Sequence, residues 1–296
     1  MQRKCWSTER EAMNEITVKK RLAPGIHYFE VKNPDIAKRA EAGQFVIVRI
    51  SEEGERIPLT IADYNRDKGL VTLVVMSVGK TTLQMETLNK GDRILDLVGP
   101  LGLPTHIEHY GKVACIGGGV GIAPIYPITR ALKEAGNYVI GILGARTREL
   151  LIFEDRMRAI CDELIITTDD GSYARKGFVT DALKDYVDSC SKVDKVFAIG
   201  PVPMMKNVCK LTRECSISTI VSLNAIMVDG TGMCGSCRVT VGGKTKFSCV
   251  EGPDFDGHLV DFDELASRQC FYREEEIESL NIYNEKMGGE CRCREA

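Results

Sequence analysis

The chain has 296 residues, of which 44% are hydrophobic and 27% are charged, and its formal net charge is −3. This length predicts two or more domains with well-filled apolar cores, and the near balance of interspersed charges argues against binding to nucleic acid or to a membrane surface. No apolar run approaches the 18 residues of a membrane span and the first residues lack a signal-peptide core, so we expect a cytoplasmic protein.

Residues 13–108 are predicted to form an antiparallel β-barrel. Apolar and polar side chains alternate with a period of two in short segments, and turns separate these segments. The clearest segments are 26–31, 44–50 and 70–76. Several short strands at close spacing are typical of a barrel.

The same barrel contains two candidate flavin-binding segments. The first, at the end of a strand, consists of Arg56, Pro58, Leu59 and Thr60. An arginine four residues before a hydroxyl can bind a phosphate while the hydroxyl meets a flavin ring, although such a pair is also common on an ordinary strand surface. The second is a turn with small hydrogen-bond donors, formed by Gly79, Thr81 and Thr82.

Residues 109–220 are predicted to form a parallel-sheet nucleotide-binding domain. Apolar strands alternate with helices in a βαβ pattern, in which helices cover both faces of the sheet. Strands are expected at 113–116, 138–143, 163–167 and 195–199, and helices at 125–135 and 150–160.

A glycine turn after the first of these strands indicates a phosphate site. It contains Gly117, Gly118, Gly119 and Gly121. Glycines at this place let a pyrophosphate approach the amides at the positive end of a helix. Gly200 and Pro201 follow another strand and Asp170 follows a third. Because open α/β sheets bind ligands at the carboxyl ends of their strands, we expect a dinucleotide here, although such turns also occur without a ligand.

The residues near the expected adenosine ribose leave the choice of dinucleotide open. Arg146 and Arg148 follow the second strand of this domain. An acidic residue there would hold a 2′-hydroxyl, whereas an arginine can accept the 2′-phosphate of NADP. Either arginine could equally be a solvated surface charge.

Residues 221–260 are predicted to form a small iron–sulfur domain. Its four candidate ligands are Asp229, Cys234, Cys237 and Cys249. Their spacing follows the plant-type [2Fe–2S] pattern, with an aspartate in place of the first cysteine. Interleaved glycines let the backbone fold round a cluster. The alternatives are a zinc site, or three free thiols with Asp229 as a turn residue.

Residues 261–296 form the C-terminal part, where a helix is expected at 273–284 before an irregular tail. Cys270, Cys291 and Cys293 could contact a partner or bind metal, but free thiols are the commoner explanation. In a reducing compartment the twelve cysteines are better explained as cofactor ligands and buried thiols than as a disulfide framework.

The motifs and their order resemble the ferredoxin–NADP reductase superfamily. The resemblance is carried by Arg56-x-Pro-Leu-Thr60, Gly99-Pro-Leu-Gly102, Gly117-Gly-Gly-Val-Gly-Ile-Ala-Pro124 and Gly200-Pro201-x-x-Met204. The cluster segment is similar to that of the electron-transfer subunit of class 1B dihydroorotate dehydrogenase. It is more similar to the small subunit of NADH-dependent reduced ferredoxin:NADP+ oxidoreductase, a bifurcating transhydrogenase whose cluster has one aspartate ligand.

The resemblance implies FAD in the barrel, NAD(H) in the nucleotide domain and a [2Fe–2S] cluster at Asp229 and three cysteines. Hydride would pass between nicotinamide and flavin N5, a step that needs geometry more than a protein acid or base. Thr60 would contact the flavin near N5 and Arg56 would neutralise its pyrophosphate. The cluster would pass electrons to a larger flavoprotein subunit with [4Fe–4S] clusters, which would bind NADP(H) and exchange electrons with ferredoxin.

Two features depart from this resemblance, and two other functions stay open. Arg146 and Arg148 fit poorly with a preference for NAD(H), and Thr81 replaces the second glycine of the superfamily's flavin motif. The chain could instead be a stand-alone NAD(P)H reductase. It could also be the electron-transfer subunit of an NAD-dependent dihydroorotate dehydrogenase, in which a fourth cysteine ligand is usual.

Overall fold

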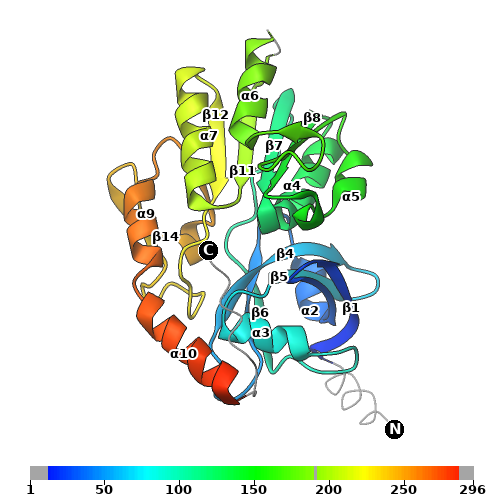
Figure 1. Cartoon of the computed structure of the whole chain (residues 1–296), viewed down its shortest axis with the longest axis vertical. Helices are drawn as coiled ribbons and strands as arrows, with labels where there is room; N and C mark the ends of the chain where they lie inside the picture. Colours follow the sequence, from blue (N-terminus) through cyan, green and yellow to red (C-terminus); the bar gives the residue numbers. More distant parts are fainter. Residues whose placement is uncertain (1–12, 190–191, 287–296) are drawn as a thin grey trace.

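The computed structural model describes residues 13–189 and 192–286. Figure 1 shows a β-barrel and an α/β domain stacked along the long axis of the molecule, with the C-terminal segment running along one side of both. Within the described ranges, no helix combines the length and the apolar character that crossing a membrane requires.

Six antiparallel strands form the barrel, in the order β1-β2-β5-β4-β3-β6, as predicted for this part of the chain. An isolated antiparallel bridge between Glu15 and Arg93 helps to close it. Alternate side chains such as Phe29 and Leu73 are fully buried inside, which explains the period of two in the sequence. The elements are β1 (Glu15–Ala23), β2 (Ile26–Lys32), α2 (Pro34–Arg39), β3 (Phe45–Arg49), β4 (Ile57–Asn65), β5 (Leu70–Met76), α3 (Lys80–Thr87) and β6 (Asp96–Leu101).

Seven strands form the second sheet, in the order β10-β9-β8-β7-β11-β12-β15. Every neighbouring pair is parallel except the last, in which β15 runs antiparallel to β12. The parallel sheet with its helices confirms the predicted α/β fold. Its strands are β7 (Lys112–Gly118), β8 (Tyr138–Ala145), β9 (Glu163–Thr168), β10 (Arg175–Lys176), β11 (Lys195–Ile199) and β12 (Ser218–Ser222). Its helical elements are η1 (Gly119–Gly121), α4 (Ile122–Glu134), η2 (Arg148–Leu150), α5 (Glu154–Arg158), α6 (Val179–Asp188) and α7 (Val202–Glu214).

Both faces of this sheet are buried, so its strands are apolar throughout rather than alternating. In β7, Ala114 and Ile116 pack into one core, whereas Val113 and Cys115 pack into another on the opposite face. All four side chains are fully buried. The pattern explains why this strand is a continuous apolar run in the sequence.

The cluster segment leaves the nucleotide sheet and then returns to it. After a long loop, β13 (Arg238–Val241) and β14 (Lys244–Phe247) form a hairpin, and the short helix α8 (Ser248–Glu251) follows. β15 (Asp254–Asp256) then adds the edge strand to the nucleotide sheet. The predicted iron–sulfur stretch therefore completes the neighbouring domain, and the domain boundaries stay a prediction.

The two apolar cores also extend across the parts of the chain. On one face of the sheet, a single buried cluster includes Ala62 and Val74 of the barrel together with the residues of α4. On the other face, a second cluster joins Phe45 of the barrel and Phe255 of β15 to α6 and α7. The three parts therefore pack as one body.

Two C-terminal helices connect the cluster segment to the barrel. Arg268 of α9 (Phe262–Gln269) donates a hydrogen bond of 3.1 Å to the backbone carbonyl of Ser236. α10 (Arg273–Lys286) packs against α3, and Ser279 donates to the carboxylate of Glu55 at 3.0 Å. The helix expected at 273–284 is thus confirmed.

The helix expected at 150–160 is shorter than the sequence predicts. Only α5 is helical there, after the 3-10 turn η2. Phe153 adopts a φ of 58°, in the left-handed region that a right-handed helix cannot include. Its ring is buried in the core shared with the barrel, so tertiary packing overrides the local helical pattern.

The shared core predicts that a change in β15 destabilises the whole molecule. Phe255→Ala should lower the free energy of unfolding by about 3 kcal/mol, because it removes a buried ring. Urea unfolding followed by circular dichroism measures this. Phe271→Ala is the control, since that ring is 73% exposed. A separate early transition of the cluster segment, with the main transition unchanged, would contradict a shared core.

Candidate functional site

The carboxyl ends of β7 and β11 bring four of the predicted dinucleotide residues together. A Cβ on Gly118 would lie 2.3 Å from the sulfur of Met204 and 3.4 Å from Cδ of Pro201. A Cβ on Gly200 would lie 2.7 Å from Cε of Met204. These two glycines therefore let the Met204 side chain pack over the ends of both strands.

The other glycines of the turn differ in what they face. A Cβ on Gly117 would lie 2.9 Å from Cα of Ile122, and one on Gly121 would lie 2.4 Å from the carbonyl oxygen of Ile199. Gly119 has a φ of 56°, and a Cβ there would meet nothing within 4 Å. Packing therefore explains Gly117 and Gly121, whereas Gly119 borders open space at the start of α4. A pyrophosphate fits such a place, because free amides and the helix dipole both favour an anion.

The ends of β8 and β9 place a basic residue beside two acidic ones. The amides of Asp169 and Asp170 donate to the carbonyls of Ala145 and Arg146, at 3.1 and 3.2 Å. The pKa of Asp169 is raised, mainly because the side chain is partly buried. The positive charge of Arg146 lowers this pKa, and the negative charge of Asp170 raises it further. Hydrogen bonds from Ser172 lower the pKa of Asp170.

Arg148 stacks on an aromatic ring. Its guanidinium carbon lies 4.9 Å from the centre of the Tyr173 ring, a cation–π distance. Its backbone amide donates to the hydroxyl of Ser172 at 2.9 Å. Of the two arginines that the sequence left open, Arg146 is the one whose charge acts on the pKa of Asp169.

The first flavin segment lies just before β4 and in its first half, whereas the sequence predicted it at the end of a strand. Thr60 is half-buried and pairs with Phe45 of β3, while Pro58 pairs with Ile47. Leu59 pairs with Val46 of β3, and Arg56 is exposed immediately before β4. The strand thus holds the hydroxyl in place and leaves the guanidinium free to meet solvent or a ligand.

The second flavin segment surrounds the start of α3. The hydroxyl of Thr82 accepts hydrogen bonds from the amides of Val78 and Gly79, at 3.0 and 2.9 Å. Thr81 is buried, and its hydroxyl donates to the carboxylate of Glu55 at 2.7 Å. A Cβ on Gly79 would meet nothing within 4 Å. The two threonine hydroxyls thus serve local structure, and Gly79 alone faces open space.

The structure also tests whether the barrel fits a flavin. Ser77 lies directly before the Val78–Gly79 turn, and its hydroxyl is buried without a hydrogen-bond partner in the described part of the chain. A buried hydroxyl of this kind normally has a partner. An unpaired donor next to the open space at Gly79 fits a bound polar cofactor.

The carboxylate of Asp229 organises the cluster loop, which we define as residues 229–237. Oδ1 accepts a hydrogen bond from the amide of Thr231 at 3.0 Å. Oδ2 accepts from the amides of Met233 and Cys234, at 3.0 and 2.9 Å. The hydrogen bond from Thr231 is the main reason that the pKa of Asp229 falls to about 2. The carboxylate is therefore ionised at neutral pH, and Oδ1 retains a lone pair for a metal.

The four candidate ligands form two pairs. The sulfur atoms of Cys237 and Cys249 are 3.1 Å apart and buried, and burial raises the pKa of Cys249 to about 12. Cys234 is exposed and joined to Asp229 through its amide. Burial tends to raise the pKa of Cys234, but hydrogen bonds from Ser236 outweigh it, so that the pKa is lowered.

Paired donors fit a two-iron cluster better than a single ion. Across residues 13–189 and 192–286, no three His, Cys, Asp or Glu side chains converge as the ligands of one metal ion do. A zinc site requires four donors around one centre, whereas a [2Fe–2S] cluster divides its ligands between two irons. Gly230, Gly232 and Gly235 all have positive φ, which bends the loop between the pairs.

A buried hydroxyl lies beside one of these ligands. Ser248 is fully buried next to Cys249, and its hydroxyl has no partner among the described residues. Hydrogen bonds to cluster sulfurs are common in such sites. Of the C-terminal cysteines, Cys270 is exposed, whereas Cys291 and Cys293 lie outside the described residues.

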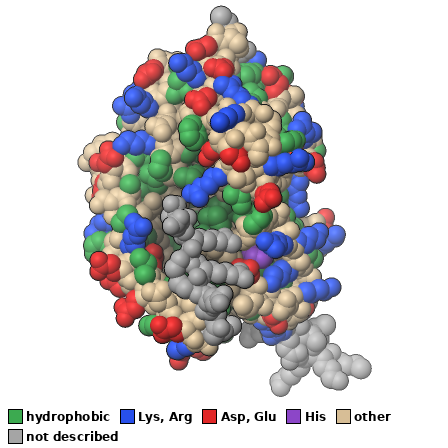
Figure 2. Space-filling view, viewed as in Figure 1, with side chains coloured by type: hydrophobic (Ala, Val, Ile, Leu, Met, Phe, Trp, Pro, Cys, Tyr) green, Lys and Arg blue, Asp and Glu red, His purple; other side chains and the backbone are tan. Residues whose placement is uncertain are grey.

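Apolar side chains are exposed around the cluster loop. Met233 is 89% exposed, and Val228 and Val250 are 42% and 45% exposed. Figure 2 shows apolar side chains gathered near the middle of one face of the molecule, with acidic and basic side chains interspersed around them. Exposed apolar groups beside a redox loop are typical of a contact surface.

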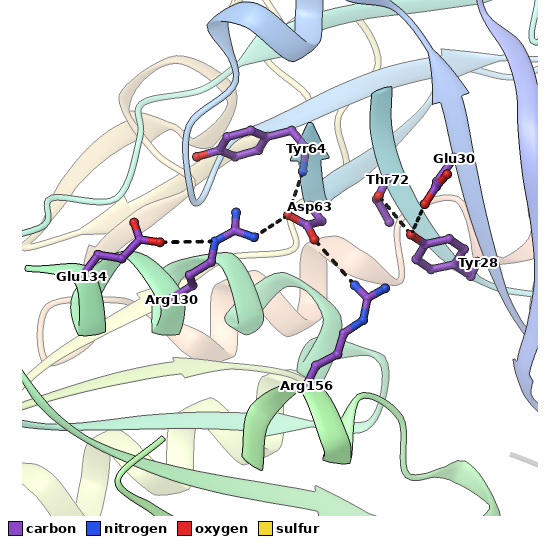
Figure 3. Close-up of polar contacts among 8 residues, drawn as sticks. All are labelled: Tyr28, Glu30, Asp63, Tyr64, Thr72, Arg130, Glu134 and Arg156. Carbon is purple, nitrogen blue, oxygen red and sulfur yellow. Dashed lines mark hydrogen bonds and ion pairs between the residues drawn. The ribbon is translucent and has the colours of Figure 1, made fainter. Parts of the chain in front are cut away.

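A further polar cluster, outside the residues predicted from the sequence, lies between the barrel and the nucleotide domain (Figure 3). Asp63 of β4 forms ion pairs with Arg130 of α4 and Arg156 of α5. These residues border a cavity of about 260 Å³. No motif marks them, because 67 positions separate Asp63 from Arg130.

The different surroundings of Gly119 and Gly121 predict different effects of the same substitution. Gly119→Ala should cost about 1–2 kcal/mol of stability through its positive φ and weaken NADH binding roughly tenfold to a hundredfold, the equivalent of one charge-assisted hydrogen bond. Gly121→Ala should cost about 3 kcal/mol through overlap with the Ile199 carbonyl. Calorimetric titration and urea unfolding measure both effects. Equal NADH affinity in Gly119→Ala and the wild type would contradict this assignment.

Two sequence models of known domains match the chain. The oxidoreductase NAD-binding domain matches residues 115–210, which include the glycine turn and the acidic pair. The iron–sulfur cluster binding domain of dihydroorotate dehydrogenase B matches residues 224–261, which include all four candidate ligands. These matches confirm the prediction of NAD and an iron–sulfur cluster as cofactors.

Similar proteins extend over nearly the whole chain. A homologue of the dihydroorotate dehydrogenase B (NAD+) electron transfer subunit from Thermotoga maritima is 52% identical, over 94% of this chain and 98% of that protein. The electron transfer subunit from Desulforamulus reducens is 35% identical, over 81% of this chain and 94% of that protein. Among solved structures, a chain of the NADH-dependent reduced ferredoxin-NADP oxidoreductase, studied for flavin-based electron bifurcation, is 50% identical. It has a TM-score of 0.88 and covers 92% of this chain and 98% of that chain.

These similarities agree with the arrangement of the parts. A barrel is followed by a nucleotide domain and then by a cluster segment, and the matched domains and the matched solved structure follow the same order. The chain therefore belongs to the family of dihydroorotate dehydrogenase B electron transfer subunits and their homologues, within that superfamily, and is an electron-transfer oxidoreductase subunit.

Proposed function

We propose that this chain is the NADH-facing subunit of an electron-bifurcating NADH/ferredoxin:NADP+ transhydrogenase. It exchanges hydride with NAD(H) at FAD and passes single electrons through a [2Fe–2S] cluster to a partner flavoprotein. The observation that carries the proposal is the carboxylate of Asp229, held by three loop amides where a cysteine thiolate is usual. The similarity to a chain of the bifurcating NADH-dependent oxidoreductase supports it.

The barrel residues would hold FAD at the edge facing the nucleotide domain. Arg56 would bind the pyrophosphate, and Thr60 would contact the flavin ring from its fixed place opposite Phe45. The open space at Gly79 and the unpaired hydroxyl of Ser77 support a cofactor at the start of α3. Thr81 is given no contact with the cofactor in this assignment, because its side chain is buried and its hydroxyl hydrogen is donated to Glu55.

The nucleotide domain would bind NAD(H) at the carboxyl ends of its strands. The turn at Gly119 would receive the pyrophosphate, and Met204 would pack near the nicotinamide. Asp169 and Asp170 beside Arg146 support NAD(H) over NADP(H), because carboxylates accept hydrogen bonds from ribose hydroxyls and repel a 2′-phosphate. NADP(H) is the alternative if the attraction of Arg146 for a 2′-phosphate exceeds the repulsion from Asp169 and Asp170.

The cluster would be held by the two pairs of ligands. Cys237 and Cys249 would share one iron, and Asp229 and Cys234 would share the other. When bound, FAD supplies conversion between two-electron and one-electron transfer, and the cluster supplies a one-electron carrier. Since hydride transfer needs alignment rather than a protein acid or base, the residues of this chain act by binding and orienting.

A larger partner subunit would receive the electrons. The exposed side chains of Val228, Met233 and Val250 around the cluster loop support a contact surface there. In this proposal the partner contains flavin and [4Fe–4S] clusters, binds NADP(H) and exchanges electrons with ferredoxin. The cytoplasmic location expected from the sequence stays a prediction.

A second candidate is the electron-transfer subunit of an NAD-dependent dihydroorotate dehydrogenase. Its support is the match of residues 224–261 to the iron–sulfur domain of that enzyme. The same cofactors and the same internal electron path would serve both functions. Asp229 argues for the transhydrogenase, because a fourth cysteine is usual in the dihydroorotate system.

Replacement of the aspartate tests its role as a ligand. In Asp229→Cys we expect an altered electron paramagnetic resonance spectrum and a shifted reduction potential, with two irons retained per chain. Cys270→Ser is the control, because this exposed thiol lies outside the cluster loop. A spectrum and a potential identical to those of the wild type would show that Asp229 is not a ligand.

Purification with the native partner tests the function. We expect NADH to reduce the bound flavin at least roughly tenfold faster than NADPH does, the effect of about 1.4 kcal/mol of repulsion between the acidic pair and a 2′-phosphate. The co-purified subunit should contain flavin and [4Fe–4S] clusters. A partner that oxidises dihydroorotate would overturn the transhydrogenase in favour of the second candidate.

A further inference from the structure

One carboxylate of the barrel is shared by two arginines of the nucleotide domain (Figure 3). The distance from Asp63 Oδ1 to Arg130 Nη1 is 2.8 Å, and the distance from Oδ2 to Arg156 Nη1 is 3.6 Å. Asp63 belongs to β4, and the arginines belong to α4 and α5. A single side chain therefore connects three elements of two domains.

A β-bulge directs Asp63 toward the nucleotide domain. The pairing of β4 with β5 shifts register between Ile61 and Asp63. Without this shift the two side chains would lie on the same face of the strand, and Ile61 is fully buried inside the barrel. The extra residue turns the strand, so Ala62 packs into the core shared with the nucleotide domain and Asp63 reaches the arginines.

Aromatic rings flank both guanidinium groups, and the guanidinium carbon of Arg130 lies 5.6 Å from the ring centre of Tyr64 and 5.5 Å from that of Tyr126. The guanidinium carbon of Arg156 lies 4.6 Å from the ring centre of Phe153, 5.4 Å from that of Tyr28 and 5.7 Å from that of Tyr126. The side chains of Asp63 and Arg130 are 21% and 27% exposed. Ion pairs that are partly desolvated and stacked on aromatic rings are more directional than those on an open surface.

The same elements carry the residues that the proposed function assigns to the two cofactors. Thr60 lies three positions before Asp63 in β4. α4 begins directly after the glycine turn at Gly119, and it packs on β4. A rotation of α4 at Arg130 would therefore move the dinucleotide turn relative to the flavin strand.

We propose that Asp63 is a positioning residue for hydride transfer between NAD(H) and FAD. Through Arg130 and Arg156 it sets the orientation of the nucleotide domain on the barrel, and so the alignment of the nicotinamide with the flavin. This inference rests on the proposed function.

Asp63→Asn tests the inference, because it keeps the shape of the side chain and removes its charge. Stopped-flow reduction of bound FAD by NADH should slow roughly tenfold to a hundredfold, the usual effect of a misplacement of about 1 Å. FAD content and NADH affinity should stay within about twofold of the wild type, because the residues that bind the two cofactors in the ground state are unchanged. The primary deuterium isotope effect with NADH deuterated at C4 should rise.

Two further variants control for general effects on the fold. Asp96→Asn breaks the pair with Arg49, whose atoms are 2.6 Å apart, but both residues lie within the barrel. NADH should reduce the FAD bound to Asp96→Asn at the wild-type rate. Arg130→Met should slow the reaction in the same direction, because it removes the shorter of the two ion pairs of Asp63. Adding it to Asp63→Asn should have little further effect, because Asp63→Asn already removes that pair.

Hydrogen–deuterium exchange separates failure of this inference from failure of the proposed function. Asp63→Asn should speed exchange in α5 and in the turn that contains Gly119, and Asp96→Asn should not. Unchanged exchange and unchanged flavin reduction in Asp63→Asn would overturn the positioning role. A wild-type flavin that NADH does not reduce would overturn the proposed hydride transfer, and with it the role of Asp63.

Discussion

The whole molecule depends on the packing of both faces of the seven-stranded sheet. One face joins the barrel through the cluster that includes Ala62 and α4, and the other joins the cluster segment through Phe255. Close-packed interiors resist displacement, so the flavin strand, the dinucleotide turn and the cluster loop keep fixed relative positions. Hydride transfer and electron transfer both depend on distance, and this packing brings the three sites together, while the ion pairs of Asp63 are proposed to refine the alignment of two of them.

Most of the architecture could be predicted from the sequence because its periodicity has simple physical causes. A period of two marked the half-buried strands of the barrel, and continuous apolar runs marked the strands buried on both faces. Long-range packing decided the rest. The helix expected at 150–160 shortens because Phe153 turns into the shared core, and β15 crosses from the cluster segment into the nucleotide sheet, which no local pattern indicates.

In the candidate site too, the sequence predicts what depends on local spacing and misses what depends on long-range packing. Spacing alone located Asp229 and the glycine turn, but it could not distinguish Gly119, which borders open space, from Gly121, which is needed for packing. It also could not show that Thr81 is tied to Glu55. Asp63 was missed altogether, since its role depends on a β-bulge and on arginines far along the chain.

The edge position of β15 bears on how this protein avoids aggregation. An open sheet edge is a template for aggregation, and here β15 covers the edge of β12. The cover is anchored by Phe255, whose ring packs into the core shared with α6 and α7. Any change that releases this strand would therefore expose the edge of β12 to other chains.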